Sequence, residues 1–211
     1  MDDAAVFIDG FNLYHGICEA GLKPWLWVDL GKLARVLVPS SLNVCEVNYY
    51  TAHSKQEGSR ERQGAFLEAN RELNPTGLNI VTGFMQQADC CTCRKCSITF
   101  RRWQEKRTDV NMAVDIVKGA MEPKPRFQVA MLVTGDADQA AAVEVARQCG
   151  LRVLIRFPPN RHSTELETAA GGNQNAYLMT QKQLEKAQMP DTVHRLGGKN
   201  TILRPGQWGE R

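Results

Sequence analysis

The chain has 211 residues, a formal net charge of +3 at pH 7 and a hydrophobic content of 43%. This length allows one well-buried domain with at most a small appendage. The positive and negative charges are nearly balanced, so the protein could bind a polyanion only through local clusters of basic residues. The sequence has no apolar run near the roughly 18 residues of a membrane span, so we expect no membrane segment. Its N-terminus is acidic, so we expect no signal peptide. Its cysteines do not resemble a disulfide framework, and we therefore expect a cytoplasmic location.

Hydrophobic patterning predicts strands that alternate with helices. In chain order we expect a strand at 4–8, helices at about 13–20 and 30–37, a strand at 42–52, a helix at 58–73, a strand at 78–85, a helix at 108–121, a strand at 128–133, a helix at 138–149 and a strand at 151–156. This alternation is typical of an α/β fold with a mostly parallel central sheet that is covered by helices on both faces.

Two segments allow more specific expectations. In the helix at 108–121, the residues Val110, Val114 and Val117 follow a helical spacing and predict its buried stripe. The tail at 190–211 is rich in Gly, Pro and Arg, which favours an extended basic arm. We therefore expect one domain at 1–189, with a Cys-rich, basic insertion at about 86–106, followed by this arm.

Acidic residues stand where the predicted strands end. Asp9 ends the first strand, Asp136 and Asp138 follow the fourth, and Asp109 opens the helix at 108. Because parallel strands end at one edge of a sheet, Asp9 and the pair Asp136 and Asp138 converge if the first and fourth strands are neighbours. Clustered carboxylates resist ionisation unless a divalent cation binds them, and Mg²⁺ or Mn²⁺ prefers such oxygen ligands. The pattern predicts metal-assisted phosphodiester hydrolysis.

Each acid also has a purely structural alternative. Asp9 and Asp138 are both well placed to cap the helix that follows them. Asp109 lies in the first turn of its helix, where a negative charge is stabilised by the helix dipole.

Three sequence blocks occur in a distinctive order. They are "VFIDGFNLYHGI", "KRTDVNMAVDIV" and "MLVTGDADQAAAVEVARQCGLRVLI". Together they resemble the signature blocks of the NYN domain, a branch of the PIN-like nucleases, with the LabA-like subgroup most similar, and the resemblance extends from residue 4 to about 187. It implies a PIN-like three-layer α/β/α sandwich and a metal-dependent ribonuclease. It places Mg²⁺ or Mn²⁺ at Asp9, Asp109, Asp136 and Asp138, and implies that Asn12 orients a carboxylate or a water molecule at the metal.

The sequence departs from the family pattern at two places. Gln139 stands where the family usually has an aromatic or apolar residue, and "ETAAGG" at 167–172 stands where many members carry an acid. These departures favour an alternative from another class, a catalytically weak RNA-binding or regulatory module. A phosphatase-like enzyme acting on small phosphoesters is a further alternative, and the oligomeric state is open, with a homodimer as one option.

Four cysteines are crowded into the stretch "DCCTCRKC". The spacing of Cys90, Cys91, Cys93 and Cys96 includes two Cys-x-x-Cys pairs, which is typical of zinc knuckles. A structural zinc ion is one interpretation, with His53 as an outside ligand. A cluster of free or redox-active thiols is another.

Basic and aromatic residues are interleaved just before Asp109. Basic side chains neutralise phosphates and aromatic rings stack on unpaired bases, which predicts contacts with single-stranded RNA here. The residues are Arg94, Lys95, Arg101, Arg102, Trp103, Lys106 and Arg107. A solvated hairpin with Trp103 in the core is the structural alternative, and "IRFPPNRH" at 155–162 adds a second basic loop.

Overall fold

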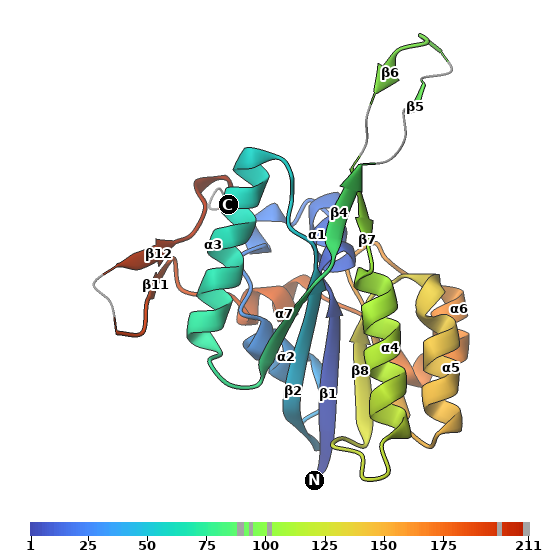
Figure 1. Cartoon of the computed structure of the whole chain (residues 1–211). Coiled ribbons are helices and arrows are strands. Elements are labelled where there is room, and N and C mark those ends of the chain that lie inside the picture. The colour runs from blue at the N-terminus through green and yellow to red at the C-terminus, as the bar shows by residue number, and fades with distance from the viewer. Residues whose placement is uncertain (88–90, 93–94, 101–102, 198–199, 209–211) are drawn as a thin grey trace.

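The computed structural model of the chain contains a central six-stranded parallel sheet with helices on both faces (Figure 1). It describes residues 1–87, 91–92, 95–100, 103–197 and 200–208. The strand order is β10-β9-β8-β1-β2-β3, and every neighbouring pair is parallel. These strands are β1 (Asp2–Asp9), β2 (Leu42–Thr51), β3 (Leu78–Thr82), β8 (Val129–Val133), β9 (Arg152–Phe157) and β10 (Ala176–Leu178).

The helices form the two outer layers. One face of the sheet is covered by α1 (Gly10–Glu19), α2 (Leu30–Leu37), α3 (Glu57–Leu73) and α7 (Gln181–Lys186), and the other by α4 (Thr108–Met121), α5 (Ala140–Gln148) and α6 (Thr164–Ala169). Short 3₁₀ turns complete the layers: η1 (Lys23–Trp25), η2 (Ala137–Gln139), η3 (Asn173–Asn175) and η4 (Gly206–Trp208). The predicted three-layer α/β/α sandwich is confirmed, and among the described residues no helix is both long and apolar enough to cross a membrane.

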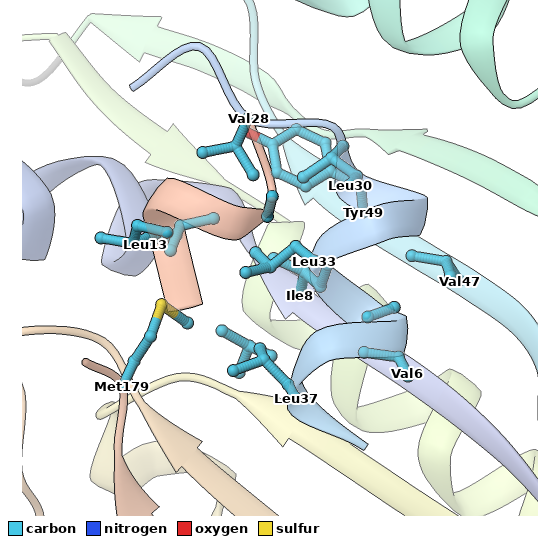
Figure 2. Close-up of a cluster of buried hydrophobic side chains, with 14 of the residues drawn as sticks. Val6, Ile8, Leu13, Val28, Leu30, Leu33, Leu37, Val47, Tyr49 and Met179 are labelled. Atoms are coloured by element: carbon cyan, nitrogen blue, oxygen red, sulfur yellow. The ribbon is translucent and has the colours of Figure 1, made fainter. Parts of the chain in front are cut away.

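Strand β1 explains why the sheet lies in the middle. Val6 and Ile8 pack against the α2 side, where they meet Leu30 and Leu33 (Figure 2), while Phe7 packs with the opposite cluster. Successive side chains of a strand point to opposite faces, so a strand that is apolar at every position must be buried on both. The uninterrupted run "AAVFI" therefore forms the centre of the molecule.

The orientation of α4 differs from the expectation. Val110 and Val114 are 64% and 43% exposed, and the buried residues are Thr108, Met112, Ile116 and Gly119. The physical reason is close packing: a Cβ added at Gly119 would lie 2.4 Å from the ring of Phe127. The helix approaches the core through Met112, Ile116 and Gly119, while Val110 and Val114 face outward.

The C-terminal tail also differs from the expected extended arm. It forms the antiparallel hairpin β11 (Thr192–His194) and β12 (Thr201–Leu203), followed by η4. Val193, Ile202 and Trp208 are buried in the core cluster on the α3 side. The central residue of each short strand is apolar and buried while both of its neighbours are exposed, so one face of each strand packs on the core.

A single buried amide links α2 to α3. Asn70 is fully buried, its Oδ1 accepts from the Leu30 backbone N–H at 2.7 Å, and its Nδ2 donates to the Val28 carbonyl at 3.0 Å. The first N–H groups of a helix have no partner within the helix, so Asn70 satisfies one that would otherwise be orphaned.

Replacement of Asn70 by Ala should lower the free energy of unfolding by about 2–4 kcal/mol, because two buried backbone groups lose their partner. Urea denaturation measures the change. The control is Asn43→Ala, where an exposed amide bonds to Asp3 at 2.6 Å, and its effect should stay within about 0.5 kcal/mol. Equal stability of the two variants would contradict this account of Asn70.

Candidate active site

The predicted neighbours in the sheet are neighbours in the structure. β1 pairs with β8 in parallel, with Ile8 opposite Val133, so both strands end at the same edge. Asp9 is the last residue of β1, and Asp136 follows β8 after the two loop residues Thr134 and Gly135. The first turn of α4 reaches this edge too, because the side-chain amide of Gln139 donates to the Asp109 carbonyl at 3.1 Å.

Three carboxylates converge at this edge. Asp9, Asp109 and Asp136 each offer an oxygen atom, and these atoms all lie within 4.8 Å of one another. Asp9 is buried, while Asp109 and Asp136 are half-buried. Three hard oxygen donors at this spacing fit a divalent cation such as Mg²⁺ or Mn²⁺. Asp138 is exposed on the next turn and does not join this group, although its charge acts on Asp109.

Asp9 has a capping role as well as a place in this cluster. Its Oδ1 accepts from the Asn12 backbone N–H at 2.9 Å, which caps α1, and its Oδ2 accepts from the Thr134 hydroxyl at 2.9 Å. Burial raises the pKa of Asp9 while these hydrogen bonds lower it, and the net direction is upward. The structural and the chemical interpretations of Asp9 are therefore compatible.

The loop that carries Asp136 is held from two sides. Thr134 Oγ1 accepts from the Asp136 N–H at 3.1 Å, and Asn12 Oδ1 accepts from the Gly135 N–H at 3.1 Å. Asp136 Oδ1 accepts from the Asp138 N–H at 3.1 Å, so Asp136, and not Asp138, caps the following turn η2. Asn12 thus fixes the position of the loop, and its proposed role in orienting an acid or a water molecule stays a prediction.

Mutual repulsion is clearest at Asp109. Burial raises the pKa of Asp109 to about 7, with further contributions from Asp9, Glu105, Asp136 and Asp138. The pKa of Glu105 is raised too, mainly by burial and also by Asp9 and Asp136. A site of this kind carries excess negative charge, which a bound cation would offset.

This repulsion makes the stability of the metal-free protein depend on pH. The pKa of Asp109 is about 7 when folded and about 4 when unfolded, so the cost of its charge is absent below about pH 4, grows as the pH rises and is complete above pH 7. In EDTA, Asp109→Asn should thus become progressively more stable than the wild type across this range. After discounting for solvent screening, we expect about 1–2 kcal/mol, or about 2–8 °C in melting temperature.

Thermal unfolding at several pH values measures the difference between the two proteins. Mn²⁺ should raise the melting temperature of the wild type at pH 7 and have a smaller effect on Asp109→Asn. A constant difference between the proteins at every pH would contradict the repulsion.

Two residues of the site were not singled out from the sequence, and a third, Gln139, was singled out only as a departure from the family pattern. Thr134 is fully buried between Asp9 and Asp136, and Glu105 on β7 (Trp103–Lys106) accepts from the Thr108 N–H at 2.9 Å at the start of α4. Gln139 is 1% exposed and links η2 to α4. Thr134 could have been selected from the sequence, because it stands between the apolar run at 128–133 and the "GD" that contains Asp136. Glu105 could not, because its place depends on how the insertion folds.

The basic segment is described only in part. Trp103 is 42% exposed on β7, so it lies outside the core, and Lys106 is exposed. The Arg107 guanidinium lies 5.0 Å from the centre of the Phe84 ring on β4 (Phe84–Gln87), the strand that pairs with β7. Lys95 is exposed, whereas Arg94, Arg101 and Arg102 lie outside the described residues.

The second basic loop offers less free charge than expected. Arg156 is buried and donates to the carbonyls of Leu37 and Ile155, and Arg161 forms an ion pair with Glu19. These two cations therefore already have partners within the protein.

The cysteine segment forms a small hairpin away from the acidic residues. β5 (Cys91–Thr92) pairs with β6 (Thr99–Phe100) beyond the ends of β4 and β7 (Figure 1). Cys96 is exposed and not in a disulfide. Cys90 and Cys93 lie outside the described residues, so zinc binding at Cys90, Cys91, Cys93 and Cys96 stays a prediction.

The parallel sandwich with acidic residues at one sheet edge is the arrangement of a PIN-like fold. The chain belongs to the NYN domain family, whose model matches residues 3–173. No curated protein gives a match. Among solved structures, the chain is similar to a protein of unknown function from Vibrio parahaemolyticus, with 19% identity, a TM-score of 0.56 and coverage of 85% of this chain and 94% of that one. This likeness supports the fold alone.

Proposed function

We propose that this protein is a metal-dependent ribonuclease that hydrolyses phosphodiester bonds of single-stranded RNA. The observation that carries the proposal is the convergence of Asp9, Asp109 and Asp136 within 4.8 Å at the sheet edge of a member of a PIN-like nuclease family. When bound there, Mg²⁺ or Mn²⁺ would supply an activated water and offset charge on the scissile phosphate.

The protein's own residues prepare this site before any substrate arrives. Asp9 is fixed by two hydrogen bonds, and Asp136 is fixed by Thr134 and by its cap of η2. Preorganised groups need no reorganisation during the reaction, which is a large part of how such sites accelerate it. Asp138, on the exposed side, would position a water or the substrate strand.

Two features bear on the alternatives. Gln139 braces α4 against η2 through its hydrogen bond to Asp109, so it supports the acidic site instead of disrupting it. The basic and aromatic side chains on β7 favour a polymeric substrate over a small phosphoester. For the proposed RNA contacts we retain the full set of Arg94, Lys95, Arg101, Arg102, Trp103, Lys106 and Arg107. The cytoplasmic location and a homodimer remain predictions from the sequence.

Incubation with mixed single-stranded RNAs tests the proposal. We expect cleavage with Mn²⁺ or Mg²⁺ and none with EDTA, and calorimetry should find metal binding that Asp136→Asn weakens. RNA binding without any metal-dependent cleavage would instead support the RNA-binding module.

A further inference from the structure

A cavity of about 580 Å³ opens directly beside the acidic edge. Its lining includes Gly10 and Phe11, the two residues that follow Asp9. The rings of Tyr49, Phe66 and Trp208 are buried and line its inner wall, and the ring centres of Phe66 and Trp208 are 6.2 Å apart. The cavity is thus preformed and lined in part by aromatic rings, as is typical of sites for small organic ligands.

The mouth of the cavity also carries aromatic rings, and these are accessible. Trp103 on β7 is 42% exposed and Tyr14 on α1 is 37% exposed. The Lys55 ammonium lies 5.7 Å from the centre of the Trp103 ring. A flat ligand that enters the cavity would therefore meet an exposed indole whose neighbour is a cation.

The charged residues that line the cavity have one sign. Lys55 and Arg62 line it, no Asp or Glu does, and neither cation forms an ion pair with any residue that the structure describes. A second hollow shares Lys55 and adds His53 and Arg60. A polyanion would find uncompensated positive charge here, whereas a basic peptide would be repelled.

Strand β7 connects this cavity to the acidic cluster. Trp103 and Glu105 are two positions apart, so they lie on the same face of the strand, about 7 Å from each other. Trp103 lines the cavity, while the charge of Glu105 acts on Asp109. Burial and the charge of Asp9 both raise the pKa of Tyr49 in the cavity wall. The two sites are therefore adjacent parts of one surface.

We propose that this cavity binds an unpaired nucleobase of the RNA strand next to the scissile phosphate, with Trp103 and Tyr14 at its mouth and Lys55 and Arg62 near the flanking phosphates. The link to cleavage rests on the proposed function. Every base has a face that stacks on an aromatic ring, so such a site tolerates different sequences. A base in a duplex is stacked and paired and would have to leave the helix first, which gives a physical reason for single-strand preference.

The test measures binding in EDTA, where no cleavage occurs. Fluorescence anisotropy compares a short labelled oligouridylate with an abasic ribose-phosphate strand of the same length. The wild type should bind the strand with bases about tenfold more tightly. Trp103→Ala should lose most of this preference, and Trp103→Phe should retain it. Tyr177→Ala, which removes a 52% exposed ring on β10, is the matched control and should behave as the wild type.

A second readout separates charge from stacking. Lys55→Ala should flatten the salt dependence of binding to both strands, whereas Lys118→Ala, on the exposed side of α4, should not. Equal affinity of the wild type for the two strands, or an unchanged preference in Trp103→Ala, would overturn the inference and favour an apolar peptide segment as the occupant. A base preference that depends on Trp103, together with no RNA cleavage when Mn²⁺ replaces EDTA, would refute the nuclease proposal and leave the nucleobase site intact.

Discussion

Asp9→Asn should reduce metal-dependent RNA cleavage by about a hundredfold or more while leaving the protein folded. The substitution removes one of three converging charges, which we expect to cost several kcal/mol of transition-state stabilisation. The fold should survive, because an Asn carbonyl can still accept from the Asn12 N–H and its amide can donate to Thr134. RNA binding in EDTA should be close to that of the wild type.

Asp29→Asn is the matched control for this experiment. Asp29 also caps a helix, α2, by accepting from the Lys32 N–H at 2.9 Å, and it belongs to no acidic cluster among the described residues. It should cleave RNA at the wild-type rate. If Asp9→Asn does so as well, the activity belongs to a contaminant or to another part of the protein.

Gly135→Ala should reduce both stability and activity. A Cβ at this position would lie 2.1 Å from the Arg161 carbonyl oxygen, which is a backbone atom that cannot rotate away. We expect the overpacking to cost about 1–3 kcal/mol and to displace the loop that carries Asp136. Because a misplacement of about 1 Å can cost about a hundredfold in rate, cleavage should fall much further than stability alone explains. Denaturation and single-turnover cleavage measure the two effects.

Gly64→Ala provides the comparison for a glycine without such a neighbour. Gly64 is exposed in α3, and an added Cβ would meet no atom within 4 Å. Alanine should stabilise this helix by about 0.5–1 kcal/mol and leave cleavage unchanged. Wild-type activity in Gly135→Ala would mean that the position of this loop does not limit the reaction.

The sheet and the position of its acids could be predicted because both follow from short-range rules. The apolar runs at 4–8 and 128–133 indicate strands that are buried on both faces. Once these strands are parallel neighbours, Asp9 and Asp136 must share an edge. Asp109 could be placed only through the resemblance to a family, since nothing in its own helix indicates where that helix lies against the sheet.

Other features depend on packing that no local pattern records. The buried face of α4 was predicted wrongly because Gly119 and Met112, not the valines, fit against Phe127 and the sheet. The tail reads as a polar arm, yet its few apolar residues complete the core around Trp208. The aromatic cavity combines residues from α1, α3, β7 and η4, whose proximity arises only on folding.

The capping roles of Asp9 and Asp136 affect which acids would persist during the evolution of this family. Asp9 and Asp136 each cap a helical turn, so a descendant that had lost catalysis would still be selected to keep both. Within the described part of the chain, the Asp109 carboxylate accepts no hydrogen bond, and burial raises its pKa. Folding alone therefore favours its replacement by a neutral residue. In a comparison of relatives, an acid retained at this one position would be the most informative sign that selection still maintains the reaction.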